Sequence, residues 1–152
     1  MAKIEREKFG VRVMREGDVE AIIGIDAKVT GSRRSDYYER KVASMLDKKG
    51  SIAASLVGEY KGRVIGFIMG NIYTGEFGIP QTTASLDTIG IDPDHAGQGI
   101  GTLLLEEFVN HVKAAGVDTI QTLVDWQDTA LLKFFNKCGF EPSKTLNLEK
   151  RV

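Results

Sequence analysis

The stretch "DPDHAGQGIGTLL", residues 92–104, places three glycines at alternate positions directly before an apolar run with helical spacing. The first backbone N–H groups of a helix have no acceptor within the helix, and together with the helix dipole they favour an anion. Glycine lets a phosphate approach this backbone because no Cβ stands in the way. The junction at 96–102 is therefore a candidate phosphate-binding turn. The alternative is an ordinary tight turn that needs glycine only for its positive φ.

The composition around this stretch is typical of one globular domain. The chain has 152 residues, of which 42% are hydrophobic and 27% charged, and its formal net charge is −1. We expect a single domain over residues 1–152. The charge balance gives no reason to expect nucleic acid or an anionic membrane as a partner. No apolar run reaches the roughly 20 residues that cross a bilayer, and the charged N-terminus lacks a signal core. With a single cysteine, these features predict a cytoplasmic protein.

Hydrophobic periodicity and turn residues predict a mixed α/β order of elements. Strands are expected over 11–14, 51–60, 63–74, 83–91, 119–125 and 145–151, and helices over 19–29, 36–48, 100–115 and 129–137. Asp18 is the expected N-cap of the first helix, and Asp36 with Glu39 resembles a capping box. Lys61-Gly62 predicts a hairpin turn. The two strands on either side of the glycine turn and its helix should be parallel.

Nucleotide-binding motifs match the glycine turn poorly. A P-loop needs a lysine after its last glycine, but Thr102 follows Gly101 directly. A dinucleotide fingerprint needs a third glycine where Thr102 stands, and its strand should open a repeating β-α-β pattern. A nucleotide-binding protein is therefore an alternative that would show binding of ATP or NAD and none of coenzyme A (CoA).

Two other motifs match much better. Residues 89–108, "IGIDPDHAGQGIGTLLLEEF", resemble the acyl-CoA-binding motif of the GNAT acyltransferase superfamily, (Q/R)-x-x-G-x-(G/A), with Gly99 and Gly101 as its glycines. Residues 128–140, "DTALLKFFNKCGF", resemble the second motif of the family, N-x-x-A-x-x-(L/F)-Y-x-x-x-G-F. The order of elements also matches the family, so the resemblance covers nearly the full chain and is strongest over 83–140.

The resemblance implies a GNAT fold, which is α/β with a central mixed, mostly antiparallel sheet, two splayed parallel strands and flanking helices. It also implies acetyl-CoA as co-substrate, lying between the splayed strands. The residues implied to bind it are Ile89, Gly90 and Ile91 for the pantetheine, Gly97, Gln98, Gly99, Ile100, Gly101 and Thr102 for the pyrophosphate, and Asp128 and Phe135 of the second motif.

The activity that the resemblance implies is transfer of an acetyl group from acetyl-CoA to a primary amine, by direct attack in a ternary complex. A backbone N–H near Gly90 or Ile91 would stabilise the oxyanion. The resemblance makes Asp87 the candidate base, because it lies on the strand beside the expected acyl group, where the family often carries a Glu or a water-positioning base. Strand interiors disfavour aspartate, so its presence needs a reason; the alternative is an outward-facing or salt-bridged Asp87. The candidate acceptor-contacting residues are Tyr37, Tyr38 and Trp126, each with a packing role as its alternative.

Three positions depart from the family motifs. Ala96 stands where Gln or Arg is usual, which should weaken CoA binding without abolishing it. Asp128 replaces Asn but can still cap the helix that follows. Phe135 replaces a Tyr that is a proposed general acid, and its ring is expected to shield the thioester from water. A degenerate acyl-CoA-binding regulatory module without turnover is therefore the second functional hypothesis.

The remaining polar residues suggest few further sites. His95 and His111 have no metal-ligand spacing and are expected at the surface, so no metal site is predicted. Cys138 is expected to be a reduced packing thiol. Asp125 is a lesser candidate for a site role. The expected partner is a small-molecule or peptide amine, and the family resemblance is compatible with a homodimer.

Overall fold

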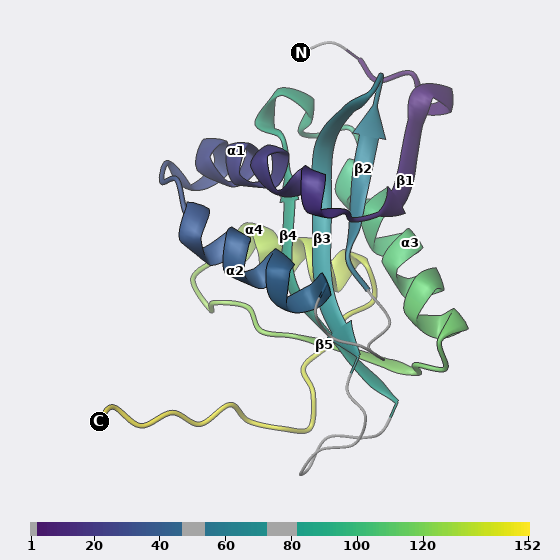
Figure 1. Cartoon of the computed structure of the whole chain (residues 1–152). Helices are drawn as coiled ribbons and strands as arrows, with labels where there is room; N and C mark the ends of the chain where they lie inside the picture. Colours follow the sequence, from purple (N-terminus) through teal and green to yellow (C-terminus); the bar gives the residue numbers. More distant parts are fainter. Residues whose placement is uncertain (1–2, 47–53, 73–81) are drawn as a thin grey trace.

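Five strands form one sheet in the computed structural model, in the order β1-β2-β3-β4-β5, and helices lie on both of its faces (Figure 1). The structure describes residues 3–46, 54–72 and 82–152. The strands are β1 (Phe9–Val13), β2 (Leu56–Tyr60), β3 (Arg63–Ile72), β4 (Thr83–Ile91) and β5 (Thr119–Thr122). The helices are η1 (Arg6–Lys8), η2 (Glu16–Asp18), α1 (Val19–Thr30), α2 (Ser35–Leu46), η3 (Pro93–His95), α3 (Ile100–Ala114) and α4 (Thr129–Lys137).

The sheet is mixed and mostly antiparallel. Each of β1 to β4 pairs antiparallel with the next, whereas β4 and β5 pair in parallel. α3 forms the crossover between the parallel strands, as a β-α-β connection requires. This confirms the expected α/β class and the parallel pairing across the glycine turn.

The hairpin between β2 and β3 is built by its two turn residues. Lys61 has φ 49° and Gly62 has φ 78°, and Tyr60 pairs with Arg63 on either side of them. Two successive positive φ angles give a turn whose twist matches the twist of the strands. The predicted Lys61-Gly62 turn is confirmed.

The core has two parts, one on each face of the sheet. α1 and α2 lie on one face of the sheet and α3 lies on the other (Figure 1). Phe67 and Met69 of β3 pack with residues of α1 and α2, whereas Ile68 between them packs with residues of α3. Because both faces are covered, β3 is a nearly continuous apolar run instead of an alternating one. The longest helix, α3, has 15 residues, and no helix within the described ranges is long and apolar enough to cross a bilayer.

Asp18 lies at the predicted N-cap position of α1, but its side chain does not cap the helix. Its carboxylate accepts two hydrogen bonds of 2.8 Å from the Arg12 guanidinium and one of 2.7 Å from the Arg15 N–H. None of the N–H groups of α1 bonds the Asp18 side chain. The bonds from Arg12 outweigh burial and hold the pKa of Asp18 below its ordinary value of 3.8. Asp18 therefore ties β1 to the start of α1.

The other helix boundaries largely agree with the sequence. α4 spans the predicted residues, and α3 begins and ends at its expected glycine-flanked ends, with Gly116 at φ 90°. α2 begins at Ser35, so Asp36 lies inside its first turn and the predicted capping box is wrong. The predicted end of this helix at residue 48 lies outside the described residues.

Two strand predictions were wrong at the C-terminal side. β5 ends at Thr122 instead of residue 125. Residues 145–151 form no strand and are exposed, because no described strand pairs with them. The predicted strand residues 51–53, the last two predicted residues of the β3 strand and the predicted loop 75–81 lie outside the described residues.

Candidate functional site

The parallel ladder between β4 and β5 is short. It joins four residue pairs and ends at Leu86 and Thr122, where the Thr122 hydroxyl donates a 2.8 Å hydrogen bond to the Leu86 carbonyl. β4 continues through Asp87–Ile91, for which the described residues supply no partner on this side. We call Asp87–Ile91 together with residues 123–128 the strand fork. The two parallel strands thus stop pairing partway along β4, as the family resemblance implied.

β4 also carries an irregularity at the base of the strand fork. On its β3 side, Met69 pairs with Thr88 whereas Gly70 pairs with Leu86, so Asp87 is the extra residue of a β-bulge. A bulge re-aims the side chain that it contains, which explains how a strand interior accommodates an aspartate. Asp87 therefore lies where the ladder to β5 ends and the ladder to β3 is interrupted.

Three donors hold the Asp87 carboxylate. The amide of Asn71 donates a hydrogen bond of 2.7 Å, the hydroxyl of Ser85 one of 2.9 Å, and the Nζ of Lys41 lies 3.2 Å away. Lys41 comes from α2, and the side chains of Lys41 and Asp87 are 19% and 24% exposed. Asp87 is thus the salt-bridged aspartate that the sequence left as an alternative, fixed in one orientation but still partly accessible.

The backbone of β4 presents N–H groups to the strand fork at alternate residues. The N–H of Asp92 donates to the carbonyl of Ile65 on β3, at 2.8 Å. Successive N–H groups of a strand point to opposite edges. Gly90 therefore also points its N–H toward β3, whereas Ile89 and Ile91 point theirs toward the open edge. Of the two amides proposed for the oxyanion, the geometry favours Ile91 over Gly90.

Gly90 has a packing role in the structure. A Cβ at this position would lie 2.5 Å from Cε1 of Phe67, which is fully buried on the neighbouring strand. Any side chain at residue 90 would displace the Phe67 ring. Residue 90 is therefore glycine because the Phe67 ring, which packs between the sheet and helices α1 and α2, occupies the space of a side chain.

The glycine turn before α3 leaves the first amides of the helix without a side-chain cap. Gly97 and Gly99 have φ of 75° and 79°, a region that favours glycine, and a Cβ on Gly97 would meet nothing within 4 Å. Gly99 is the N-cap of α3, and no side chain caps this end. The first amide that bonds within the helix is that of Leu103, which donates to Gly99. The amides of residues 100–102 therefore have no acceptor within the helix, an arrangement that favours an anion.

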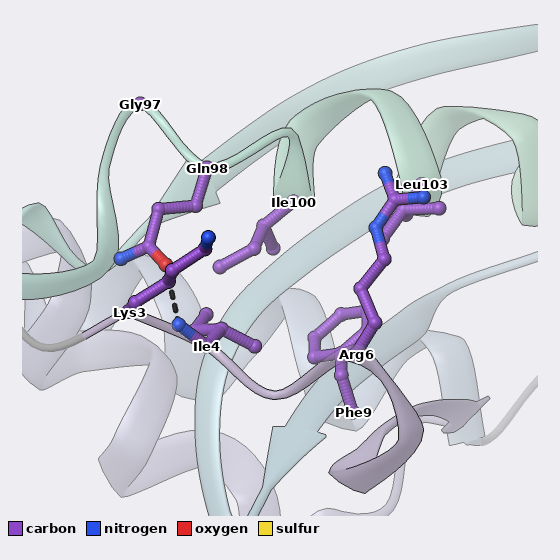
Figure 2. A pocket seen from close by; sticks show the side chains of 8 residues that line it. All are labelled: Lys3, Ile4, Arg6, Phe9, Gly97, Gln98, Ile100 and Leu103. Carbon is purple, nitrogen blue, oxygen red and sulfur yellow. Dashed lines mark hydrogen bonds between the residues drawn. The ribbon is translucent and has the colours of Figure 1, made fainter.

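The N-terminal segment, residues 3–8, crosses beside this turn (Figure 2). The Ile4 N–H donates a 2.6 Å hydrogen bond to Oε1 of Gln98, and the Glu5 N–H donates one of 3.2 Å to the hydroxyl of Tyr60. A cavity of about 280 Å³ lies between this segment, the glycine turn and the first turn of α3. The Gln98 side chain is thus engaged by the N-terminal segment.

Arg6 brings a positive charge to the glycine turn. Its Nη2 lies 3.7 Å from the position that a Cβ of Gly99 would occupy. Arg6 is exposed, and no carboxylate of the described residues lies within ion-pair distance of it. Lys3 lines the same cavity (Figure 2). The structure thus places cations beside the turn although Ala96 provides none.

The two predicted tyrosines differ in their surroundings. Tyr38 is fully buried, and its hydroxyl donates a 2.8 Å hydrogen bond to Asp26 of α1. Burial and this bond raise the pKa of Tyr38 to about 12. Tyr37 is 43% exposed, with the guanidinium of Arg34 at 5.4 Å and Nζ of Lys41 at 5.6 Å from its ring centroid. Tyr37 is available to a ligand, whereas Tyr38 holds α2 against α1.

Of the two selected residues of the second motif, Asp128 caps α4 as expected, whereas Phe135 is buried. The Asp128 carboxylate accepts a 3.1 Å hydrogen bond from the Leu131 N–H, so the predicted cap of α4 is confirmed. Phe135 is only 4% exposed and packs against Phe134 and Phe140. The ring that lies beside the glycine turn is Phe134, 3.4 Å from the Cβ position of Gly101. Almost none of the Phe135 ring is accessible to a ligand in this arrangement.

The residues that follow β5 are open to solvent. Trp126 is 87% exposed. The Asp125 carboxylate accepts a 2.7 Å hydrogen bond from the Gln127 N–H and shapes the turn before α4. The structure therefore gives Asp125 a role in forming the turn, and the sequence analysis had made it only a lesser candidate for the functional site.

Asp92 connects α1 to the end of β4. Its carboxylate is buried, accepts a 3.0 Å hydrogen bond from the Asp94 N–H and lies 3.2 Å from Nζ of Lys28. Burial alone would raise the pKa of Asp92, but these two partners outweigh it and hold the pKa below 3.8. The ionised carboxylate thus fixes the entrance to the glycine turn.

The structure also places the two histidines and the cysteine. His95 is half-buried instead of exposed, with its ring 6.0 Å from that of Tyr60, and His111 is half-buried on α3. Burial raises the pKa of the Cys138 thiol, as a packing role predicts. Within the described parts of the chain, no three His, Cys, Asp or Glu residues gather as a metal site would require.

Comparison with known proteins identifies the family. Residues 20–140 match the model of the acetyltransferase (GNAT) family. The chain therefore belongs to the GNAT acetyltransferase family, and the resemblance seen in its two motifs is confirmed.

Solved structures share this fold at low sequence identity. One is aminoglycoside N-acetyltransferase AAC(6')-Iy in complex with CoA (TM-score 0.79, 16% identity, covering 94% of each chain). Another is the ribosomal-protein-S18-alanine N-acetyltransferase from Escherichia coli (TM-score 0.71, 20% identity, 90% of this chain and 79% of that one). A third is a transcriptional regulator from Bacillus halodurans C-125 (TM-score 0.77, 20% identity, 95% and 99%). Proteins with different described roles thus share this fold.

Sequence reasoning missed three residues that shape the candidate site. Lys41 pairs with Asp87, Arg6 lies beside Gly99, and Phe134 lies beside Gly101. Lys41 and Arg6 have no motif around them, and their partners lie far along the chain. Phe134 directly precedes Phe135, the motif residue that the sequence analysis selected. The two side chains point to different sides of the helix, so Phe134 could have been considered in place of Phe135.

Proposed function

We propose that this protein is an N-acetyltransferase that uses acetyl-CoA and transfers the acetyl group to a primary amine. One observation carries the proposal. The β4–β5 ladder ends at Leu86 and Thr122, and the same strand, β4, leads through η3 and the glycine turn to a helix end without a side-chain cap. A ligand with an extended arm and a pyrophosphate fits this combination. The extended arm can pair with the open edge of β4, and the pyrophosphate can bind the uncapped end of α3.

The proposed CoA-binding groups follow from this arrangement. Backbone groups of Ile89–Ile91 would pair with the pantetheine arm along the open edge of β4. The amides of Gly97–Thr102 would hold the pyrophosphate, with the Arg6 guanidinium supplying the cation that the motif lacks at Ala96. Asp128 and the aromatic rings of α4 would form the opposite side, and Phe134 has more accessible surface there than Phe135.

The chemistry that bound acetyl-CoA supplies is an acetyl group activated as a thioester. The N–H of Ile91, which points to the open edge, would donate to the carbonyl oxygen as negative charge develops on it. Asp87 would accept the proton of the incoming ammonium, directly or through one water. The free amine would then form a C–N bond to the thioester carbon, the C–S bond would break as the oxyanion collapses, and CoA would leave as a thiolate that takes up a remaining proton of the amine. Lys41, Asn71 and Ser85 keep this carboxylate oriented for that step.

The exposed aromatic residues on both sides of the strand fork suggest where the acceptor binds. Tyr37 on α2 and Trp126 after β5 are accessible and would contact it. Tyr38 would not contact the acceptor. Its hydrogen bond to Asp26 holds α2 against α1 and so holds Lys41 in place beside the candidate base. The acceptor is proposed to be a small-molecule or peptide amine, in a cytoplasmic protein.

A second candidate function is an acyl-CoA-binding module with a regulatory output and no turnover. Two residues favour it: Ala96 removes the usual phosphate-binding side chain, and Phe135 has no proton to donate. A fold neighbour described as a transcriptional regulator shows that the fold also occurs in a protein with that description.

The test combines binding and turnover. Calorimetric titration with CoA should show binding to one site, and thiol release should be measured with acetyl-CoA and a panel of primary amines. Amine-dependent thiol release supports the transferase. Binding of CoA without release for any amine favours the regulatory module. Binding of ATP or NAD but not of CoA would contradict both proposals.

A further inference from the structure

A lysine of the chain itself is held at the candidate base. Nζ of Lys41 lies 3.2 Å from Oδ2 of Asp87, and α2, which carries Lys41, lies on the same face of the sheet as α1 (Figure 1). A base must come within about 2.6–3.2 Å of the nitrogen whose proton it takes, or within reach through one water. Lys41 therefore places a primary amine in the position that an acceptor nitrogen would take against Asp87.

The burial of Lys41 separates it from the other paired lysines. Among lysines that pair with a carboxylate in the described parts of the chain, the side chain of Lys41 is 19% exposed, whereas Lys8, Lys28 and Lys61 are 51%, 47% and 57% exposed. A reagent that is free in solution should therefore reach those three lysines more readily than Lys41. Preferential acetylation of Lys41 would require a donor bound at the strand fork.

The two partners of this ion pair differ in how firmly they are held. Oδ2 of Asp87 accepts a 2.7 Å hydrogen bond from the amide of Asn71, and Oδ1 accepts one of 2.9 Å from the hydroxyl of Ser85. Lys41 has a flexible four-carbon stem, so its Nζ can leave the carboxylate without a shift of the backbone. The fixed partner is thus suited to be the base, and the movable partner to be the nucleophile.

Amine, base and acyl donor would share one segment of β4. The ladder to β5 ends at Leu86, directly before Asp87, and the thioester arm is proposed to lie along Ile89–Ile91. The ring of Tyr37, 5.6 Å from Nζ of Lys41, borders the same amine. Lys41 thus lies on the side of the strand fork where the acceptor is proposed to bind.

We propose that this protein acetylates its own Lys41, an inference that rests on the proposed acetyl transfer. The Lys41 ammonium gives one proton to Asp87, and the free Nζ forms a C–N bond to the thioester carbon. The C–S bond breaks, and CoA leaves as a thiolate that takes up one of the two protons remaining on the nitrogen. The product is an uncharged N-acetyl-lysine, so the ion pair with Asp87 is lost.

Mass spectrometry of the full chain after incubation with acetyl-CoA is the first test. The intact mass should rise by one acetyl group per chain, and peptide mapping should find that group on Lys41 ahead of Lys8, Lys28 and Lys61. The rate per chain should not depend on protein concentration, because amine and base belong to one chain. Acetyl groups spread over the exposed lysines without preference for Lys41 would overturn the proposal, and so would a rate that rises with protein concentration.

Three variants test the roles of the two residues. Lys41→Arg keeps a cation beside Asp87 but has no amine that can be deprotonated, so the intact mass should no longer rise. Asp87→Asn keeps the amine and removes the base, so labelling of Lys41 should slow by at least about tenfold. Lys8→Arg is the matched control and should be labelled like wild type. A normal mass increase in Lys41→Arg, or an unchanged rate in Asp87→Asn, would contradict the assignment.

Thiol release with the panel of primary amines, measured on the same samples, separates this inference from the proposed function. Amine-dependent release without an acetyl group on Lys41 would overturn the self-acetylation and leave the transferase proposal standing. Neither release nor acetylation in a chain that binds CoA would overturn both and favour the regulatory module.

Discussion

Nζ of Lys41 lies 3.2 Å from Oδ2 of Asp87, which joins α2 to the bulged residue of β4. The two side chains are 19% and 24% exposed, so solvent screens this pair less than a fully exposed one. The pair means that Asp87 has a structural partner as well as a proposed chemical role. The two roles can be separated by changing each residue in turn.

Asp87→Asn should lower kcat by at least about tenfold, because a positioned base typically contributes about 10²–10⁴-fold. The KM for acetyl-CoA should change little, since the thioester is bound by backbone groups. The measurement is steady-state kinetics with a responsive amine. Lys41→Met is the matched control: it breaks the same ion pair but leaves the carboxylate, and should retain more activity. Equal losses in both variants would show that Asp87 only supports α2.

Arg6→Ala should weaken CoA binding by about three- to tenfold, because one exposed charge-assisted contact to phosphate is lost. The difference should shrink at high salt, which screens exposed charges. Calorimetric titration with CoA measures both effects. Lys8→Ala provides the control, since Lys8 lies on the same 3-10 helix but pairs with Glu5 at 2.6 Å. Unchanged affinity in Arg6→Ala would remove Arg6 from the proposed phosphate site.

Gly101→Glu should abolish CoA binding, because it places a carboxylate at the helix end that is proposed to hold the pyrophosphate. Gly101→Ala should bind within about threefold of wild type, since its Cβ would meet Phe134 at an ordinary contact distance of 3.4 Å. Circular dichroism checks that both variants fold, and titration with CoA measures affinity. Wild-type affinity in a folded Gly101→Glu variant would contradict the assignment of this turn.

Asp26→Asn should reduce the free energy of unfolding by about 1–3 kcal/mol near neutral pH, because the buried carboxylate accepts bonds from Arg34 and Tyr38. The bond from Arg34 outweighs burial and holds the pKa of Asp26 below its ordinary value of 3.8. Its contribution is therefore fully present above that value and is lost as pH falls through the folded-state pKa.

Urea unfolding at a series of acidic pH values measures this effect. Wild type should lose stability on acidification more steeply than Asp26→Asn, so that the two curves converge at low pH. Glu20→Gln is the control, because its pair with Arg33 is exposed on both sides and should contribute little. Parallel curves for wild type and Asp26→Asn would show that Asp26 does not titrate as proposed.

Local chemistry made much of the fold predictable. The positive φ of Gly62, Gly97 and Gly99 and the apolar spacing of α3 depend only on residues close in sequence. The cap of α4 by Asp128 is equally local. The β-bulge at Asp87 was not predictable, because a bulge depends on the register of two strands, and the predicted strand 145–151 failed for want of a neighbouring strand.

The sequence by itself determined the family, the glycine turn and the strand edge that leads to it, because motif spacing and glycine conformation act over a few residues. Only the tertiary structure decided which side chains surround that turn. Lys41 meets Asp87 across 46 residues, and Ile4 meets Gln98 across 94. Burial of Tyr38 and exposure of Leu146 follow from how helices and strands pack. Such contacts depend on the whole chain closing on itself, which no local pattern encodes.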